Sequence, residues 1–355
     1  EELSPEQPAY VLYTSGTTGK PKGICVTNRN VCHYVRAFHN EFHLTDNDVM
    51  LQYSVCTFDI FVEEVFASLL NGAAIAIPSE EDKANIHRLM EFVEKHAVTM
   101  ISGFPYLLAE MNHLPAIPSS LRLLISGGDV LRGVYVNRLL EQAEVYNTYG
   151  PSETTVCASY YRCNGGKVLA DGTYPIGLPV KGSQIADGKE AAAGESGEIC
   201  IYGGGVSLGY IGNREEENKA FELQPDGSAM YRSGDLGYFL PDGNIAFLHR
   251  KDTQIMIYGK RVEVSEVESR LYQCENVQQA IVRAFTDENG LSYMTAYVVP
   301  ADQTIKISAV KKELSENLTS FMIPEFFVKM PFIPLNTNGK PDMEKLPVVM
   351  KAGNF

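Results

Sequence analysis

Hydroxyl, glycine and lysine side chains are concentrated in one short segment near the start of the chain. Residues 13–23 read Tyr-Thr-Ser-Gly-Thr-Thr-Gly-Lys-Pro-Lys-Gly and follow the apolar run 9–12, which predicts a short strand. Glycine lets backbone amides turn toward a ligand, hydroxyl groups add donors and lysine adds charge, and this combination suits a polyphosphate. The spacing is not that of a P-loop, because Lys20 is followed by Pro21. The alternative interpretation is a polar surface loop.

A second segment joins an aromatic ring to a carboxylate across a Gly-Pro turn. Residues 147–155 read Asn-Thr-Tyr-Gly-Pro-Ser-Glu-Thr-Thr. The ring of Tyr149 can stack on a purine, and the carboxylate of Glu153 can hold Mg²⁺ beside phosphates. Taken alone, the segment is equally compatible with a simple turn that carries an incidental glutamate.

Two further carboxylates are four residues apart. Residues 57–70 predict a helix that ends at Gly72, and on such a helix Asp59 and Glu63 share one face. Like charges at this spacing destabilise a helix unless a cation lies beside them. The alternative is that Asp59 caps the helix and Glu63 points to water. The apolar stripe predicted to face the core consists of Phe58, Phe61, Val62, Val65, Phe66 and Leu69.

The elements that must position these side chains alternate between strand and helix. Predicted strands cover residues 49–55, 73–77, 98–101 and 121–126, and predicted helices cover 28–42, 85–96 and 134–141. For the first helix, Asn28 or Asn30 is the expected cap. The alternation implies parallel β-α-β units, so the loops 102–105, 126–129 and 147–153 are expected to converge on one crevice.

The second half of the chain has a different pattern of predicted elements. After Tyr174 the pattern is one of short strands and turns, including a hairpin whose turn covers residues 241–244, which predicts a β-rich subdomain. From about residue 260 onward, the order helix, two strands, helix, strand indicates a small α+β module.

Composition excludes several classes of protein. The 355 residues carry a net charge of −14 with 45% hydrophobic content, which argues against nucleic acid as a partner and is enough for two packed domains. No apolar run is long enough to span a membrane, and the start of the chain has no signal-peptide pattern. The seven cysteines form no C-x-x-C pair, which indicates reduced thiols and a cytoplasmic location.

In combination, these segments resemble the adenylate-forming superfamily, which includes acyl-CoA synthetases, luciferases and the adenylation domains of nonribosomal peptide synthetases. The resemblance runs from Thr14 to Asp342 and is strongest to peptide synthetase adenylation domains. The matching blocks are, in chain order, residues 14–23, 147–155 (N-x-Y-G-P-[TS]-E-T-T), 231–235 (Y-R-[TS]-G-D), 249–254 (G-R-x-D-x-Q, with His249 in place of the glycine), 259–268 and 338–342 (N-G-K-x-D).

The resemblance implies an α/β fold in two domains. Residues 1–249 are expected to form the large domain, with parallel or mixed sheets, helices and a β-rich subdomain from about residue 174. Residues 250–355 are expected to form a small, mobile α+β domain, with Asp252 as the hinge. Members of the superfamily have further sequence before the phosphate loop, so the front part of the large domain is expected to be missing from this chain.

The resemblance also implies ATP and Mg²⁺ as ligands, and a role for each matched residue. Lys340 is the implied catalytic lysine, and Glu153 would hold Mg²⁺. Tyr149 would contact adenine, Asp235 the ribose, and Arg250 the ribose or a phosphate. The implied nucleotide-binding residues are Thr14, Ser15, Gly16, Thr17, Thr18, Gly19, Lys20, Gly128, Asn147, Thr148, Tyr149, Asp235, Arg250 and Lys340.

The nature of the substrate depends on the two carboxylates. In amino-acid-activating members, an aspartate at the position of Asp59 pairs with the α-ammonium group of the substrate. Glu63 is the only further acid among the implied substrate residues, and a buried carboxylate needs a cationic partner. We therefore predict lysine as the first choice and ornithine as the second, in a pocket whose depth is left by small residues. The implied substrate residues are Asp59, Ile60, Glu63, Ser102, Ile125, Gly127, Thr148, Val156 and Cys157, with Lys340.

The implied function is formation of an aminoacyl-AMP with release of pyrophosphate, followed by transfer to the phosphopantetheine thiol of a peptidyl carrier protein. The resemblance is compatible with a place within a larger multidomain chain. One alternative is a stand-alone D-alanine–carrier or acyl-CoA ligase, which a solvent-exposed Glu63 would favour. A second alternative, from another class, is a truncated nucleotide-binding module without activity.

Overall fold

The computed structural model describes residues 3–14, 22–187, 195–251, 254–257, 260–286, 292–302, 304–336 and 339–349. The chain divides into two compact units, Glu1–Phe247 and Leu248–Phe355, each with its own buried apolar core. The division falls within strand β14 (Ile245–Arg250), the strand that also contains the predicted boundary after residue 249. The predicted hinge, Asp252, lies outside the described residues.

The first unit is built around a mixed sheet with the strand order β4-β3-β5-β6-β7-β8-β9. Neighbours from β4 to β7 are parallel, and β8 and β9 are added antiparallel, which confirms the predicted α/β class. The strands are β3 (Val49–Leu51), β4 (Ala74–Ala76), β5 (Met100–Gly103), β6 (Leu123–Ser126), β7 (Glu144–Tyr149), β8 (Ser159–Arg162) and β9 (Leu178–Pro179).

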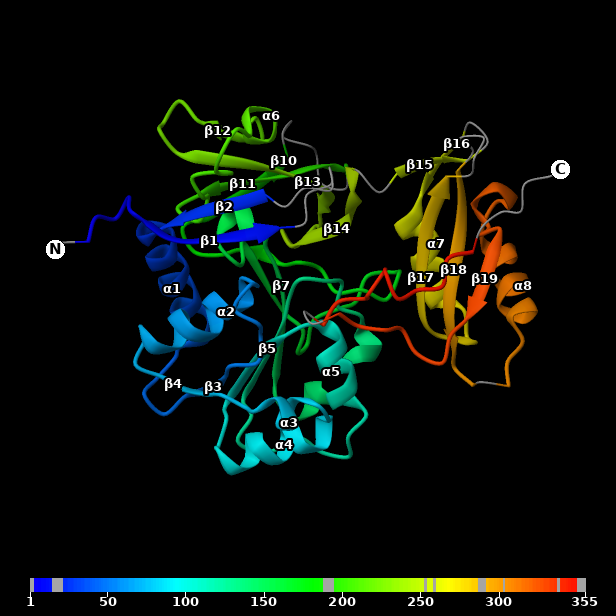
Figure 1. The fold of residues 1–355 in the computed structure, drawn as a ribbon, viewed down its shortest axis with the longest axis horizontal. Helices are drawn as coiled ribbons and strands as arrows, with labels where there is room; N and C mark the ends of the chain where they lie inside the picture. The colour runs from blue at the N-terminus through cyan, green and yellow to red at the C-terminus, as the bar shows by residue number, and fades with distance from the viewer. Residues whose placement is uncertain are drawn as a thin grey trace. The chain divides into compact units, whose positions relative to one another are not determined.

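Helices cover both faces of this sheet (Figure 1). Because side chains alternate along a strand, Met100, Leu123 and Tyr146 share the core that α1 and α2 cover. Ile101, Leu124 and Val145, whose side chains point to the opposite face, share the core that α4 and α5 cover. The α-helices of the first unit are α1 (Asn28–Phe42), α2 (Ile60–Val62), α3 (Glu80–Lys83), α4 (Ile86–Lys95), α5 (Pro105–Asn112) and, in its β-rich part, α6 (Glu215–Asn218).

The register brings the ends of the central parallel strands together. Gly103 of β5 pairs with Ser126 of β6, which in turn pairs with Asn147 of β7. The loops that follow these strands therefore leave the sheet at the same edge, as the strand–helix alternation predicts.

The helix that follows Asp59 departs from the prediction. After α2, the chain forms a π-helical segment, η1 (Glu63–Ala67), in place of a continuous α-helix. The wider turn changes the face that the later residues present. Phe66 and Leu69 are 40% and 51% exposed, whereas Glu63 and Glu64 are buried, so the predicted apolar stripe is wrong at its C-terminal end.

The N-terminal cap of α1 is Thr27 and not an asparagine. The Thr27 hydroxyl accepts from the backbone N–H of Asn30 at 3.2 Å, and Oδ1 of Asn30 accepts from the backbone N–H of Thr27 at 2.9 Å. Asn30 is therefore the second member of a capping box. The sequence indicated Asn28 or Asn30 as the cap, because the pattern alone does not separate the cap residue from its partner.

The predicted helix over residues 134–141 is replaced by two 3₁₀ turns, η2 (Gly133–Tyr135) and η3 (Leu139–Glu141). The side chain of Asn112 lies between them. Its amide donates to the carbonyl of Val134 at 3.2 Å and accepts from the backbone N–H of Arg138 at 2.9 Å. These bonds satisfy backbone groups that a continuous helix would have paired internally.

The β-rich part of the first unit has the strand order β10-β11-β13-β12, with β14 also paired to β13. The predicted hairpin between β13 and β14 is confirmed, because the N–H of Leu240 donates to the carbonyl of Asn244 at 2.8 Å. The strands β1 and β2, which flank the predicted phosphate loop in the sequence, pair antiparallel. The strands are β1 (Pro8–Thr14), β2 (Lys22–Thr27), β10 (Ser183–Asp187), β11 (Gly197–Gly203), β12 (Phe221–Leu223) and β13 (Ala229–Phe239).

The second unit contains a sheet with the order β17-β18-β19, in which β19 is parallel to β18. Helices α7 and α8 pack on it through a shared apolar core, in the predicted order of helix, two strands, helix and strand. The elements are β15 (Gln254–Ile257), β16 (Lys260–Glu263), α7 (Val264–Gln273), β17 (Val277–Thr286), β18 (Ser292–Pro300), α8 (Ile307–Asn317), η6 (Ser320–Met322) and β19 (Phe326–Lys329). In the part of the chain that the structure describes, no helix is long and apolar enough to cross a membrane.

One ion pair ties the start of β3 to β6. Nε of Arg122 donates to Oδ1 of Asp48 at 2.7 Å, and a second guanidinium nitrogen donates to Oδ2 at 2.9 Å. Burial alone would raise the pKa of Asp48, but the hydrogen bonds from Arg122, Thr45 and Thr99 lower it to about 2.

We expect Asp48→Asn to lower the free energy of unfolding by about 1–3 kcal/mol at pH 7, because it leaves the guanidinium without its carboxylate. The stabilisation by Asp48 is present above its unfolded pKa of 3.8 and is lost as the pH falls through about 2. The difference between variant and wild type should therefore shrink in acid. Urea unfolding at several pH values measures it, with the exposed Asp46→Asn as control. A difference that is independent of pH would contradict this assignment.

Candidate functional site

The predicted substrate residues of the first unit come together at the carboxyl ends of β5, β6 and β7. Ser102 of β5 pairs in register with Ile125 of β6, so their side chains are neighbours on the face that α1 and α2 cover. Every one of these predicted residues is buried: Asp59, Ile60, Glu63, Ser102, Ile125, Gly127, Thr148, Val156 and Cys157.

Glu63 is a buried carboxyl group that is only half satisfied. Its side chain is 1% exposed, and the hydroxyl of Tyr34 donates to Oε2. Within the described part of the chain, Oε1 has no hydrogen-bond partner, and no lysine or arginine forms an ion pair with this carboxylate. A buried acceptor without a partner is costly, so this oxygen is a candidate contact for a ligand.

The pKa of Glu63 reflects this environment. Burial, together with the charge of Asp59, raises the pKa from 4.5 to about 7, although the hydroxyls of Ser102 and Tyr34 lower it in part. The Ser102 hydroxyl lies near the carboxyl but does not form a hydrogen bond of normal geometry with Oε1. The carboxyl is therefore poised to change its charge near neutral pH.

The next residue, Glu64, provides an internal contrast. It is also buried, and burial raises its pKa to about 7. Its oxygens, however, accept from the backbone N–H groups of Tyr53 and Ser54, from the Ser54 hydroxyl and from the Gln52 amide. Glu64 therefore fastens the loop after β3 to the helix and has a structural role, whereas Glu63 retains an open oxygen.

Asp59 lies at the N-terminus of α2 but makes no capping hydrogen bond, so the alternative role as a helix cap is not realised. Its Oδ2 accepts instead from the hydroxyl of Ser152, which comes from the loop after β7. The Tyr10 hydroxyl is close by. It is buried without a partner among the described residues, and burial together with the charge of Asp59 raises the pKa of Tyr10.

The thiol of Cys157 is buried within reach of the charges of both acids. Burial and the charge of Glu63 raise its pKa well above the ordinary value, and Asp59 raises it further. A thiol in this environment stays protonated, so Cys157 is a neutral wall of the site and not a nucleophile.

Close backbone approaches explain two glycines of the site. At Gly150, a Cβ atom would lie 2.4 Å from the Cα of Cys157, so this turn tolerates no side chain. At Gly127, a Cβ atom would lie 2.6 Å from the hydroxyl of Thr148. The space beside Gly127 is thus taken by the Thr148 side chain, and the depth that the sequence predicted at this glycine is partly filled.

The backbone is strained where it forms the wall of the site. Thr155 and Val156 have φ angles of 62° and 70°, which β-branched residues rarely adopt. The Thr155 hydroxyl donates to the carbonyl of Gly205 at 2.6 Å, and the carbonyl of Thr155 accepts from the N–H of Cys157 at 3.0 Å. Strain of this kind is held by its surroundings and is found preferentially at functional sites.

The predicted nucleotide residues form a second group. The Tyr149 hydroxyl donates to Oδ2 of Asp235 at 2.6 Å, so the residues predicted to contact adenine and ribose touch each other. Asn147 is buried and donates to the carbonyl of Pro175 at 2.8 Å, which fixes the end of β7. Gly128 follows β6 with a φ of 78° and is exposed.

Glu153 lies in the 3₁₀ turn η4 (Ser152–Thr154), where the hydroxyl of Tyr210 donates to its Oε1. Among the described residues, no group of three or more His, Cys, Asp or Glu side chains is arranged to hold a metal ion. A lone carboxylate does not form a protein-only metal site, but it fits Mg²⁺, which takes one or two carboxylates and completes its shell with phosphate oxygens and water.

The remaining predicted residues belong to other elements, to the second unit, or to the part of the chain that is not described. Thr14 ends β1, and Ser15, Gly16, Thr17, Thr18, Gly19 and Lys20 lie outside the described residues. Arg250 ends β14 with an exposed side chain. Lys340 belongs to the second unit, where its backbone N–H donates to Oδ1 of Asn336 at 3.1 Å.

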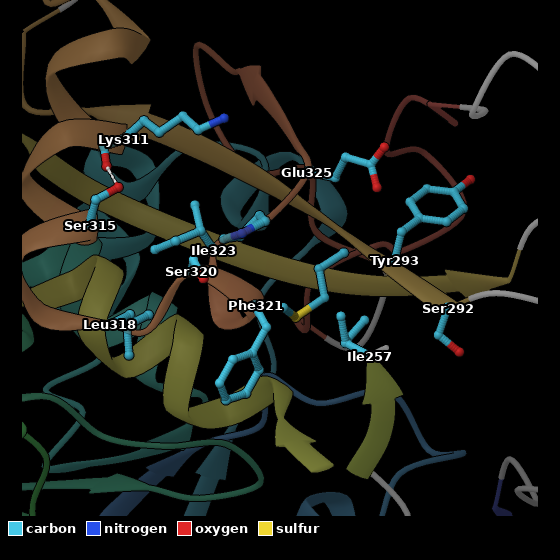
Figure 2. Close-up of a pocket in the computed structure, with 12 residues that line it drawn as sticks. Ile257, Ser292, Tyr293, Lys311, Ser315, Leu318, Ser320, Phe321, Ile323 and Glu325 are labelled. Carbon is cyan, nitrogen blue, oxygen red and sulfur yellow. Dashed lines mark hydrogen bonds between the residues drawn. The ribbon is translucent and has the colours of Figure 1, made fainter. Parts of the chain in front are cut away.

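A cavity of about 470 Å³ lies in the second unit, beside α8, η6 and β18 (Figure 2). The described residues that line it include none of those predicted for the site. Its Ser315 hydroxyl donates to the carbonyl of Lys311 on the preceding helical turn at 2.7 Å. The arrangement provides no converging group of acids or bases, and it does not compete with the first unit as the candidate site.

Sequence reasoning missed the hydroxyl groups that hold the acids: Tyr34, Ser152 and Tyr210. Tyr34 occupies an apolar position of α1 and looks like an ordinary core residue in the sequence. The available signal is that a buried tyrosine hydroxyl normally finds a partner, which makes any tyrosine on a core stripe a candidate for contact with a buried acid.

Two family models match the chain. One is described as an AMP-binding enzyme and matches residues 1–211, and the other is described as the C-terminal domain of an AMP-binding enzyme and matches residues 266–340. Bacitracin synthase 2 of Bacillus licheniformis is 40% identical over 346 residues, which are 96% of this chain and 13% of that protein. The chain thus spans only a small part of this relative.

Solved structures share the fold. NpsA of Klebsiella oxytoca, in complex with 3-hydroxyanthranilyl-AMSN, superposes with a TM-score of 0.83 at 22% identity, over 96% of this chain and 70% of that chain. The adenylation domain AlmE of Vibrio cholerae, in complex with glycyl-adenosine-5'-phosphate, has a TM-score of 0.63 at 27% identity, over 93% of this chain and 65% of that chain.

The open carboxylate of Glu63 has a consequence for stability. Its folded-state pKa of about 7 lies above the ordinary value of 4.5, so its favourable contribution is fully present below about pH 4.5 and is lost as the pH rises through about 7. As the pH rises from 5 to 8, we expect the free energy of unfolding of Glu63→Gln to increase by about 2–3 kcal/mol relative to that of wild type, since the amide has no charge to bury.

Thermal or urea unfolding at these two pH values measures the gain. Glu80→Gln, on the exposed surface of α3, is the control and should show no such swing. An equal difference between Glu63→Gln and wild type at both pH values would show that the carboxylate is not buried in an unpaired state.

Proposed function

The chain belongs to the family of AMP-binding enzymes, as its resemblance to adenylate-forming enzymes predicts, and from this premise we propose that it is an AMP-forming ligase that activates an amino acid with a long basic side chain. Lysine is the first choice and ornithine the second. The single observation that carries this specificity is the buried Glu63, whose Oε1 has no partner among the described residues.

The proposed reaction has two steps. An oxygen of the substrate carboxylate attacks the α-phosphorus of ATP, the bond between the α- and β-phosphates breaks, and pyrophosphate leaves. The phosphopantetheine thiol of a carrier protein then attacks the carbonyl carbon of the aminoacyl-AMP, and AMP leaves. The first step brings two anions together, so the site must supply positive charge and orientation.

In this proposal, each role in binding and orienting the reactants is assigned to particular residues. Lys340 contacts the substrate carboxylate and the α-phosphate, and Asp252 is the hinge that lets its domain move. Glu153 holds Mg²⁺ beside the phosphates, with its carboxylate oriented by the hydroxyl of Tyr210. The hydrogen-bonded pair of Tyr149 and Asp235 contacts the adenosine, with the tyrosine ring on the base and the carboxylate on the ribose.

The two acids of the site suit a substrate with two ammonium groups. Asp59 takes the α-ammonium, and Glu63 takes the ammonium at the end of the side chain. Both are buried, and the charge of Asp59 disfavours ionisation of Glu63. Two cations on one ligand relieve this repulsion, so binding provides the partner that a buried carboxylate otherwise lacks.

The relatives support the activity in part. Bacitracin synthase 2 is 40% identical to the chain, and the solved AlmE adenylation domain carries an adenosine phosphate joined to an amino acid. A stand-alone D-alanine–carrier ligase is the alternative that an exposed Glu63 would favour, and the 1% exposure of this side chain does not favour it.

ATP–pyrophosphate exchange against a panel of amino acids tests the proposal. We expect exchange to peak with lysine, with ornithine next, and to be lost in Asp59→Ala because the α-ammonium loses its partner. Glu63→Gln is expected to lower kcat/KM for lysine by about 30- to 1000-fold, the cost of removing one partner of a buried charge pair. Its effect on neutral amino acids should be small.

Two controls define the outcomes. Glu94→Gln, on the exposed side of α4, is expected to exchange like wild type, and Lys340→Ala is expected to lose exchange with every substrate. A peak with a neutral amino acid would retain the enzyme class and refute the role of Glu63. A protein that exchanges with no amino acid would support the inactive nucleotide-binding module.

A further inference from the structure

Three buried hydroxyl and carboxyl groups form a chain of hydrogen bonds behind the site. The Tyr160 hydroxyl, from β8, donates to the hydroxyl oxygen of Tyr34 at 3.5 Å, and Tyr34 donates its own proton to Oε2 of Glu63. All three side chains are less than 8% exposed. A hydroxyl has one proton to give, so the direction of the chain is fixed once Tyr34 donates to the carboxylate.

This chain makes the two oxygens of Glu63 unequal. Oε2 is engaged by a neutral donor of the protein, while Oε1 has no partner among the described residues. The hydrogen bond also fixes the orientation of the carboxylate before any ligand arrives. A cation that enters the site therefore meets one open oxygen at a set position.

We infer that Tyr34 is a positioning residue that makes the site select a primary ammonium over a guanidinium. The inference rests on the proposed function, because it assumes that Glu63 receives the side chain of the substrate. An ammonium is a compact point charge that one open acceptor can bind, whereas a guanidinium forms its best contact as a fork across both oxygens of a carboxylate. The Tyr34 hydroxyl already takes one acceptor position on Oε2, so a guanidinium fork would have to share that oxygen with it.

The groups around Glu63 reinforce this selection. The hydroxyl of Tyr34 lowers the pKa of Glu63 against the dominant effect of burial, so it favours the ionised form that a substrate cation needs. The other groups that face this carboxyl carry no positive charge in the described structure. They are Asp59 at the start of α2, Ser102 of β5, Cys157 after η4 and Tyr160 of β8.

Tyr34→Phe tests the inference, because it removes the hydroxyl and keeps the ring in the core. Tyr146→Phe is the matched control. Its ring is buried in the same core cluster, and its hydroxyl interacts with Glu41. Exchange kinetics with lysine, ornithine and arginine are measured for both variants and wild type between pH 6 and pH 9, in the full-length protein.

In Tyr34→Phe we expect KM for lysine to rise about tenfold while kcat changes less than about threefold, since a binding contact is disturbed and the reacting atoms are not. The preference for lysine over arginine, as a ratio of kcat/KM values, should fall by about tenfold. The midpoint of the pH dependence of KM for lysine should move to higher pH, because Glu63 loses a hydrogen bond to its ionised form.

The outcomes separate this inference from the proposed function. If wild type prefers no basic amino acid, the proposed substrate is wrong, whatever Tyr34→Phe does. If wild type prefers lysine and Tyr34→Phe keeps both the lysine-to-arginine ratio and the pH midpoint, Tyr34 does not position Glu63. A uniform loss of kcat for all three substrates, matched by Tyr146→Phe, would likewise assign Tyr34 a role in packing alone.

Discussion

The site depends on one unfavourable arrangement, a buried carboxylate with which no cation of the described structure forms an ion pair. Glu63 is held in a core between α1 and the central sheet, where burial moves its pKa to about 7. A protein tolerates such a group only if the surrounding fold is stable enough to keep it there. The rest of the first unit can be understood as the structure that keeps Glu63 buried.

Neighbouring contacts fix the frame around that carboxylate. Glu64 uses its own buried charge to bind backbone N–H groups of the loop after β3, so the π-helical segment is anchored next to Glu63. On the other side, Ser152 holds Asp59, and the bare Gly150 lets the loop after β7 lie against the backbone of Cys157. Rigid support on both sides keeps the two acids at a set separation.

The sequence predicted the α/β class, the parallel order of the central strands and the convergence of the loops, because these follow from periodicity and from the geometry of β-α-β units. It did not predict the π-helical segment, since that depends on tertiary packing and changes which side chains of one helix are buried. For the same reason Phe66 was expected in the core and Glu64 was not. The hydroxyl partners of the acids join residues more than 28 positions apart in the chain, which no local pattern records.

Backbone strain and unpaired buried charge, two features that destabilise the fold, lie close together at the site. Thr155 and Val156 have left-handed backbone angles, and they precede Cys157, whose buried thiol is affected by the charges of Glu63 and Asp59. Backbone strain and unpaired charge each destabilise a fold, and chance would scatter them over the chain. Their coincidence around one set of residues supports the proposal that a ligand binds there. A ligand with two positive charges would relieve the electrostatic part of that cost. The strained backbone of Thr155 and Val156 would remain, as part of the wall that the ligand contacts.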